Sequence, residues 1–334
     1  MIWLKIAVAA GILAFILSKV GVSEALDYAR QMSPQTIPIV LLLFLVQLTL
    51  SALRQRRVAQ LFDSEVGVLA SLRIAFIGNF FSQTFISVIG GDVSRVWLLV
   101  RLSISVGIAS CIVLFDRLSG LMAHHLMVLV ALPWLLAIFV HPTARFIVIA
   151  VAIAGTVISA GLLAAGFLSK KVDLTEWLPG SLGGKRIVRA IFHMITVKHM
   201  VFIHPGHAGI TMLFSLVIAA MNSLIIYVLF RGIGTNVSLF DCLILVPLLM
   251  ELSLLPITIG GWGLRESVMI IGFGSLGVPQ AQALLCSVLF GLCSMAVALI
   301  GGVIWLSKRE RGERFQSADA AGLLVEVENR DPTN

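Results

Sequence analysis

Charged residues are scarce in this chain of 334 residues. Asp, Glu, Lys and Arg together make up 12% of it, whereas about 25% is usual for a soluble globular domain. Hydrophobic residues make up 59%, and the mean hydropathy is +1.03. A soluble core cannot bury so much apolar surface. The composition therefore excludes an ordinary soluble protein and predicts an all-α polytopic membrane protein.

The chain also lacks the residue patterns of common catalytic and metal sites. Its four cysteines lie in apolar stretches and form no CxxC pair, which is typical of small residues in membrane helices. The sequences Gx4GK[ST], HExxH and GxSxG do not occur, so the common nucleotide, zinc-protease and serine-hydrolase signatures are missing. We therefore expect no metal, no cofactor and no enzymatic activity.

The formal net charge of +7 does not indicate nucleic acid binding. Lys and Arg occur in short clusters between long apolar runs, and such clusters face anionic lipid headgroups, mostly on the cytoplasmic side. The expected partners are membrane lipids, with a lipid-synthesis enzyme as a further candidate, and we expect no nucleic acid. The oligomeric state does not follow from the sequence.

Apolar runs predict about eight membrane segments. They lie at residues 6–22, 30–54, 74–91, 102–140, 146–168, 211–230, 239–255 and 267–307. We divide residues 102–140 into two crossings near His124 and His125, and residues 267–307 into a short segment and a full helix. Placing all basic loops on one side favours a full crossing for residues 74–91. A re-entrant hairpin also fits if another of these divisions is wrong.

The domain organisation follows from the same pattern. Residues 1–307 form one transmembrane domain, with half-repeats at roughly 1–168 and 211–307. A basic loop at residues 169–210 joins them, and its apolar residues recur at helical spacing, which indicates an amphipathic helix on the membrane surface. Residues 308–334 form a charged tail that we expect to be poorly ordered.

An internal echo supports the half-repeats. Ile89, Gly90, Gly91 and Arg95 match Ile259, Gly260, Gly261 and Arg265, at an offset of 170 residues. Five predicted crossings separate the two copies, so they would point in opposite directions, and inverted repeats with interrupted helices mark the substrate sites of transporters. Paired glycines let the backbone leave helical geometry, and an arginine beside the freed amides suits a phosphate. Alternatively, the glycines allow close helix packing and the arginines anchor helix ends.

Three further charges lie inside apolar runs, where each needs a partner or a wet cavity. Asp116 and Arg117 are adjacent, so on a helix they point about 100° apart and cannot simply neutralise each other. Arg117 either meets a phosphate or carboxylate of a ligand or is tied to Glu251 or Asp92. Glu251 is either a proton-coupling carboxylate or an anchor for Arg265.

Together these residues carry a resemblance. The sequence at 87–92 with Arg95, then Asp116-Arg117, then Glu251 and the sequence at 255–263 with Arg265-Glu266 resemble the membrane region of lysylphosphatidylglycerol synthases, a flippase-like domain, over about residues 5–307. The resemblance implies lipid translocation in a bacterial inner membrane. The synthases carry a large soluble domain after the membrane part, whereas 27 residues follow Ser307 here. We therefore expect no synthase activity.

The sequence thus predicts a flippase or transporter for a phosphate-bearing lipid, with an aminoacylated or isoprenoid-linked headgroup as candidates. The expected substrate-binding residues are Gly90, Gly91, Asp92, Arg95, Arg117, Glu251, Gly260, Gly261, Arg265 and Glu266. Two alternatives stay open. One is a membrane enzyme that acts on a lipid-linked phosphate with Asp92, Glu251 or Glu266 as acid or base. The other is a non-catalytic partner of a lipid-synthesis enzyme.

Overall fold

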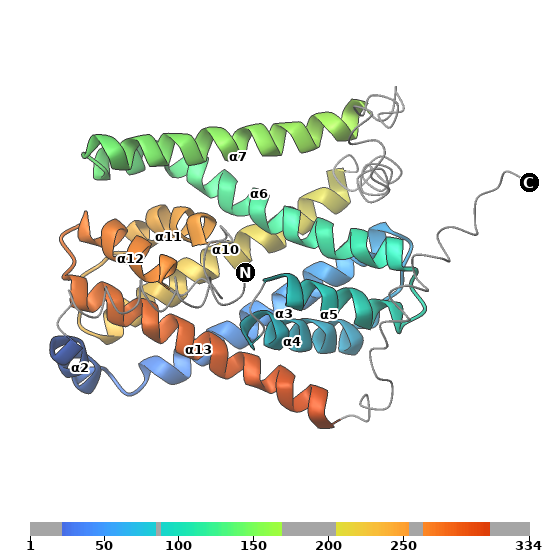
Figure 1. Ribbon diagram of the computed structural model, residues 1–334, viewed down its shortest axis with the longest axis horizontal. Coiled ribbons are helices and arrows are strands. Elements are labelled where there is room, and N and C mark those ends of the chain that lie inside the picture. The colour runs from blue at the N-terminus through green and yellow to red at the C-terminus, as the bar shows by residue number, and fades with distance from the viewer. Residues whose placement is uncertain (1–21, 85–87, 169–204, 254–262, 308–334) are drawn as a thin grey trace, which may run out of the picture.

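The computed structural model describes residues 22–84, 88–168, 205–253 and 263–307, and these residues form helices joined by short loops (Figure 1). The helices are α2 (Val22–Gln31), α3 (Thr36–Leu61), α4 (Val68–Thr84), α5 (Val88–Val100), α6 (Val106–Ile138), α7 (Pro142–Leu168), α10 (Pro205–Gly232), α11 (Leu239–Ser253), α12 (Leu264–Gly274) and α13 (Gln280–Ser307). The described part contains no strand. The chain is therefore an all-α protein, as the sequence predicts.

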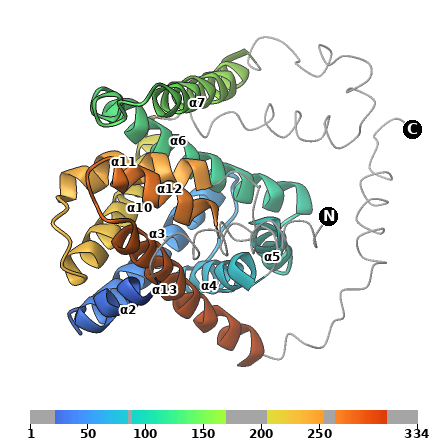
Figure 2. The ribbon, with the colours of Figure 1, turned by 60° about the vertical axis from the view of Figure 1, so that its left-hand side comes forward.

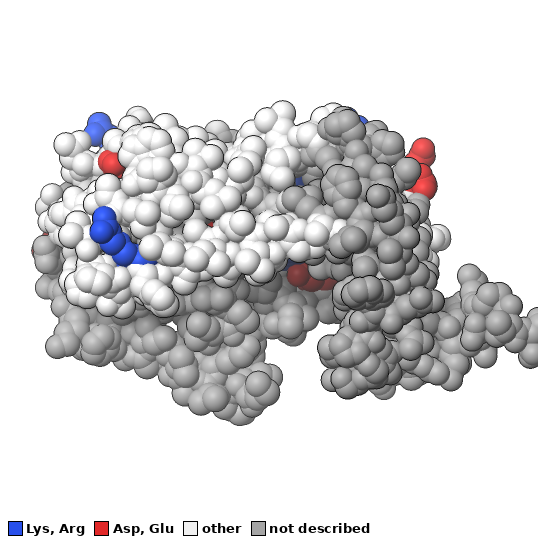
Figure 3. Space-filling model, turned by 90° about the horizontal axis from the view of Figure 1, so that it is seen from above, with Lys and Arg blue, Asp and Glu red and all other residues white. Residues whose placement is uncertain are grey.

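Five of these helices are long and apolar enough to cross a membrane: α3, α6, α7, α10 and α13. Their outward side chains are apolar as well. On α7, Phe146 is 71% exposed and Val157 65% exposed, and the face on the α7 side of the molecule shows few charged side chains (Figure 3). Large exposed apolar side chains are stable only in lipid or against another protein. The chain is therefore a multi-pass membrane protein.

Helices α3 and α10 form an antiparallel pair near the centre of the molecule (Figures 1 and 2). The start of α3 meets the end of α10, where the Ser33 amide donates to the Gly232 carbonyl over 3.0 Å. In the middle, Gln47 donates to the side chain of Asn222 over 2.8 Å. The two helices run in opposite directions along each other.

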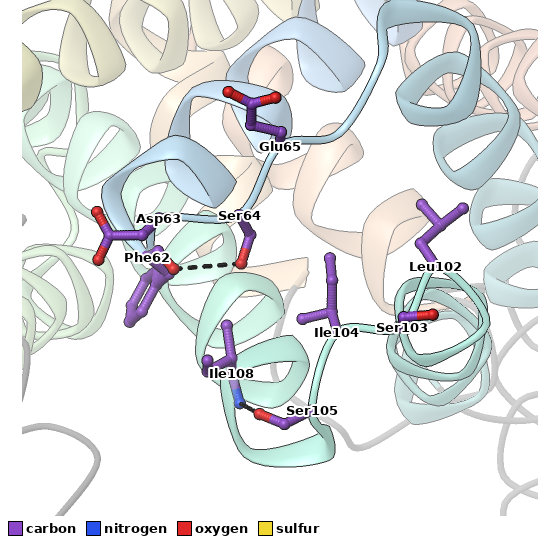
Figure 4. Close-up of a pocket in the computed structure, with 9 residues that line it drawn as sticks. All are labelled: Phe62, Asp63, Ser64, Glu65, Leu102, Ser103, Ile104, Ser105 and Ile108. Carbon is purple, nitrogen blue, oxygen red and sulfur yellow. Dashed lines mark hydrogen bonds between the residues drawn. The ribbon is translucent and has the colours of Figure 1, made fainter.

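Helices α4 and α5 form a helical hairpin. Gly91 on α5 lies against Ser82 on α4, and Arg95 lies against Gly78, so the two helices run antiparallel. The loops before α4 and after α5 meet at the same end, where Ser64 and Ser103 line one pocket (Figure 4). At 1.5 Å per residue α4 is about 25 Å long and α5 about 20 Å, less than the roughly 30 Å of a hydrocarbon core. The hairpin is re-entrant.

Helices α11 and α12 form a second, matching hairpin. Gly272 on α12 lies against Leu249 on α11. Thr235, before α11, donates a hydrogen bond to Gln282, after α12, over 3.0 Å, so this segment also returns to the side it came from. In both halves a long helix, a hairpin and a second long helix follow each other: α3 to α6 and α10 to α13. Because α3 and α10 are antiparallel, the repeat is inverted.

Backbone conformations confirm this correspondence. Two residues after α3 and α10, Asp63 and Gly234 have φ angles of 52° and 80°. Three residues after α5 and α12, Ser103 and Gly277 have φ angles of 64° and 81°. Left-handed residues at matching places close matching helices. Helices α2 and α7 lie outside the repeated unit.

Two predictions about the spans are wrong. Residues 74–91 do not cross the membrane as one segment, since they are divided between α4 and α5. Residues 102–140 are not divided at His124 and His125, because α6 is one helix of 33 residues with both histidines in its interior. The two errors compensate each other: the hairpin and the single α6 leave α6 and α7 as the crossings between Arg57 and Lys170, again an even number. Buried polar partners for the histidines, described below, remove the need for a turn there.

Other predictions fall partly or wholly outside the described residues. These are the first span at residues 6–22, the amphipathic part of the loop at 169–210, the tail at 308–334, and the second glycine pair, Gly260 and Gly261. The division of residues 267–307 into a short segment and a full helix is confirmed, because α12 ends at Gly274 and α13 begins at Gln280.

Candidate functional site

Five charged side chains meet where α3, α5 and α6 pack together, and we refer to them as the charged cluster. It consists of Arg54, Asp92, Arg95, Asp116 and Arg117. Arg54 donates to both oxygens of Asp116, from Nε over 2.8 Å and from Nη2 over 3.1 Å. Arg117 donates from Nε to Asp92 over 2.8 Å. Three guanidinium groups and two carboxylates leave this cluster with one excess positive charge.

The side chain of Arg95 is the least satisfied member of the cluster. Its Nη1 lies 3.9 Å from Asp116 Oδ2 and 4.0 Å from Asp92 Oδ1, longer than a hydrogen bond. Its Nε is buried and has no hydrogen-bond partner among the described residues. Arg95 is 7% exposed, so water does not replace the missing partner freely. A buried donor of this kind favours binding of an acceptor.

Exposure changes across the cluster. The side chains of Arg54 and Asp116 are 8% and 1% exposed, whereas those of Arg117 and Asp92 are 34% and 28% exposed. Arg95 lies between the two pairs. The cluster therefore has a closed end and an open edge, and a ligand that enters at the Arg117–Asp92 edge would reach Arg95 next.

Glycines make room for the cluster. A Cβ atom at Gly78 would lie 2.5 Å from Arg95 Nε, and one at Gly120 would lie 3.2 Å from Arg54 Nη1. Gly91 serves packing of a different kind, since a Cβ there would overlap the Ser82 side chain and the Gly78 carbonyl on α4. Gly90 and Gly91 are inside the first turn of α5. For this copy of the motif the structure supports the alternative interpretation, in which glycine allows close helix packing.

The second copy of the motif leads into a different ion pair. Arg265 donates to Glu266 Oε1 from Nη2 over 2.9 Å, and Ser287 on α13 donates to the same oxygen over 3.0 Å. The other oxygen of Glu266 accepts from the backbone N–H of Gly263, which closes the first turn of α12. Glu266 is completely buried. This pair is neutral, and its further partners are Gly263 at the start of α12 and Ser287 on α13.

The two arginines of the echo do not occupy equivalent places in the repeat. Arg95 lies five residues before the end of α5, whereas Arg265 lies nine before the end of α12. The equivalent residues are the acids Asp92 and Glu266, each eight residues before the end of its helix. The sequence motif therefore marks the repeat, but each half places its arginine differently around a shared acidic position.

Glu251 belongs to neither group. Its Oε1 lies 3.2 Å from Nδ1 of His125, while its Oε2 is buried without a hydrogen-bond partner among the described residues. One of the two interpretations of Glu251 was an anchor for Arg265, but the carboxylate beside Arg265 is that of Glu266. The structure thus brings Asp92, Arg95 and Arg117 together and places Glu251 elsewhere.

Sequence reasoning missed two important residues. Arg54 lies in one of the short basic clusters that are expected to face lipid headgroups, yet it is 7% exposed and pairs with Asp116. The need of Asp116 for a cationic partner was the signal that pointed to it. His125 was assigned to a hairpin tip, although an imidazole within an apolar run has the same need for a partner.

Comparison with known proteins identifies the family but no close relative. None of the curated proteins matches the chain. The family model described as "Lysylphosphatidylglycerol synthase TM region" matches residues 2–302, which include both hairpins, the charged cluster and the Arg265–Glu266 pair. The chain therefore belongs to the lysylphosphatidylglycerol synthase TM region family, whose name connects it with lipid metabolism.

Proposed function

We propose that this protein is a transporter that moves a phosphate-bearing lipid between the leaflets of the bacterial inner membrane, and that it is not an enzyme. The observation that carries the proposal is the buried guanidinium of Arg95, which has an unpartnered Nε and only long contacts to Asp92 and Asp116. A guanidinium in that state favours an oxyanion with several acceptor oxygens, and a lipid phosphate is such a group.

The charge of the cluster supports a monoanionic ligand. Its excess of one positive charge is expensive inside apolar helices. A phosphodiester headgroup carries one negative charge and would make the cluster neutral. Lipid hydrocarbon chains could stay in the bilayer at the partly exposed Arg117–Asp92 edge while the phosphate reaches Arg95. In this arrangement Asp92 orients Arg117, and Asp116 holds Arg54 and prevents a larger excess of charge.

The architecture supports movement between leaflets. Inverted repeats with re-entrant or broken helices let a transporter expose one site alternately to the two sides. Here the two halves have the same order of helices and opposite directions, and the charged cluster lies at the first hairpin. The remaining residues of the expected site, including Arg265 and Glu266, would then shape the second half without binding the phosphate in this state.

The enzymatic alternative finds less support. Asp92 and Glu266 both accept hydrogen bonds from arginines, so guanidinium donors already occupy oxygens of these carboxylates. A general acid or base needs a carboxyl group that can exchange its proton with the substrate. A partnership with a lipid-synthesis enzyme stays a prediction that co-purification would test.

The test is lipid translocation by purified protein in phosphatidylcholine vesicles. Each sample contains a trace of fluorescent phosphatidylglycerol, an isoprenoid phosphate or an aminoacylated phosphatidylglycerol, and a membrane-impermeant quencher reports the lipid left outside. Arg95→Gln and Arg117→Gln should each slow transport about 10- to 100-fold, the loss expected for one charge-assisted hydrogen bond. Arg57→Gln is the matched control, because Arg57 is exposed and lies one turn from Arg54.

Transport that persists at the wild-type rate in both Arg95→Gln and Arg117→Gln would refute the site. If wild-type protein moved none of the three lipids faster than empty vesicles do, the transport function would be refuted.

A further inference from the structure

A chain of hydrogen bonds outside the charged cluster connects three helices. Glu251 on α11 lies 3.2 Å from Nδ1 of His125 on α6. On the other side of the ring, Nε2 lies 3.1 Å from Oγ1 of Thr156 on α7. His125 is 4% exposed, and a Cβ atom at Gly155 would overlap its ring. The imidazole is therefore enclosed between α7 and Glu251.

The hydrogen bonds fix one of the protons on His125. Thr156 uses its only hydroxyl proton to donate to the Ala152 carbonyl over 2.7 Å. Its oxygen can then only accept, so Nε2 of His125 must carry a proton and donate it. The contact between Nδ1 and Glu251 Oε1 consequently needs one more proton, either on the imidazole beside a carboxylate or on the carboxyl group beside a neutral imidazole.

Loss of that proton would break the contact. The lone pair of Nδ1 would then face a carboxylate oxygen, and neither atom could donate. The second oxygen of Glu251 is buried and has no hydrogen-bond partner within the described part of the chain, so a carboxylate that also lost the contact with His125 would be poorly compensated in an apolar environment. The link between α6 and α11 therefore holds only while one proton is shared.

Within the described part of the surrounding helices, the charged side chains and His124 are engaged elsewhere or exposed, so we assign the shared proton to this pair. His124 contacts the Gly120 carbonyl and Asn222 on α10, and Arg231 at the end of α10 is exposed. The remaining charged groups on α6, α7, α11 and α12 have partners of their own: Asp116 with Arg54, Arg117 with Asp92, Arg145 with the Leu136 carbonyl, Asp241 with Ser238, and Arg265 with Glu266.

We propose that His125 and Glu251 form a binding site for a single proton that works as a latch: the proton holds the end of α11 on α6, and its release frees the second hairpin. Glu251 lies two residues before the end of α11, and His125 lies on the helix that carries Asp116 and Arg117 of the charged cluster. The latch thus connects the second hairpin to the lipid site. The effect of the latch on lipid transport rests on the proposed function, but proton binding by the pair can be measured separately.

The direct test is infrared difference spectroscopy of the purified protein in detergent between low and high pH. Beside the bands of exposed groups, the wild-type difference spectrum should contain bands that belong to the His125–Glu251 pair. Glu251→Gln should lose them, since the Gln amide can donate to Nδ1 without titrating, and His125→Gln should lose them as well. Glu65→Gln alters an exposed carboxylate and should keep them. Spectra of Glu251→Gln and His125→Gln that equal the wild type would overturn the proton site, whether or not lipid transport is observed.

The second test is the pH profile of lipid translocation in vesicles with equal pH on both sides. Wild-type protein and Glu65→Gln should share a profile whose limiting limb changes about tenfold per pH unit, as expected for one titrating group. The profile of Glu251→Gln should be flat. Transport by the wild type with a flat profile would overturn the latch and leave the transport function intact, whereas titrating bands without transport in any profile would leave the proton site and remove the transport function.

Discussion

The two hairpins have the same architecture but use their charges differently. In the first, Asp92 shares its helix with Arg95 and reaches across to Arg117 on α6, and the cluster keeps one excess positive charge. In the second, Glu266 at the equivalent place is satisfied by Arg265 and Ser287 and by the amide of Gly263. A neutral, fully bonded pair stabilises a fold, while an incompletely bonded cluster with excess charge binds a ligand. Under the proposed function, the first half binds the lipid and the second half has a structural role.

The largest effect is expected when an acid is neutralised. Asp116→Asn removes the carboxylate that faces both Arg54 and Arg95, so two buried cations lose their partner, and the free energy of unfolding should fall by about 3–5 kcal/mol. Glu266→Gln removes the carboxylate beside a single arginine, Arg265, which keeps its hydrogen bond to Ser287, and it keeps an oxygen for the Gly263 amide, so its loss should fall at the lower end of that range. Denaturation in mixed micelles measures both. Equal stability of Asp116→Asn and wild type would mean that the first cluster is not held by its charges.

Neutralising an arginine should separate the two halves more sharply. Arg265→Gln leaves the buried Glu266 without its cationic partner, and we expect a loss of about 3 kcal/mol in the free energy of unfolding. Arg95→Gln leaves the Arg54–Asp116 and Arg117–Asp92 pairs in place and removes the excess charge, so stability should change by less than about 1 kcal/mol.

This difference is read from the same denaturation curves, with the exposed Arg57→Gln as a reference for the loss of a surface charge. If Arg95→Gln destabilised the protein as much as Arg265→Gln, both arginines would be structural, and the contrast between the hairpins would disappear.

Glycine substitutions within the hairpins should give a smaller, graded effect. Gly78→Ala places a Cβ 2.5 Å from Arg95 Nε, within the middle of that side chain, and should cost about 1–3 kcal/mol through overpacking. Gly272→Ala meets only the tip of Leu249, at 3.0 Å, which can rotate away, so the cost should be below about 1 kcal/mol. Gly67→Ala, with no atom within 4 Å, is the control. A larger loss for Gly272→Ala than for Gly78→Ala would contradict this ranking.

The smallest effects concern the turns that close the hairpins. Ser103 is exposed and holds a φ of 64°, a left-handed conformation that disfavours side chains. Ser103→Gly should therefore stabilise the protein by up to about 1 kcal/mol. The reverse change at the equivalent place, Gly277→Ser, should destabilise it by about 1–2 kcal/mol, since φ there is 81° with no neighbouring atom within 4 Å. Thermal unfolding of the two variants should shift in opposite directions, and shifts of the same sign would show that the turns are not equivalent.

Much of the site was visible in the sequence because polar residues are rare in apolar runs. Asp92, Arg95 and Arg117 were predicted to act together, and the structure places them within one cluster. Arg54 was not predicted, because an arginine near the end of an apolar run has the same pattern whether it faces headgroups or a carboxylate on another helix. The pairing of His125 with Glu251 was not predicted either, because the two residues are 126 positions apart in the chain and meet only in the folded protein.

The sequence by itself determined that this is a helical membrane protein with two related halves, because hydrophobicity and the repeated glycine pair are properties of local segments. Tertiary structure alone decided that the segment at 74–91 turns back while the one at 102–140 does not turn. It also decided which acid each arginine meets. Both features depend on close contacts between helices, such as Gly91 with Ser82 or Arg54 with Asp116. The length and hydrophobicity of an apolar run do not specify such contacts.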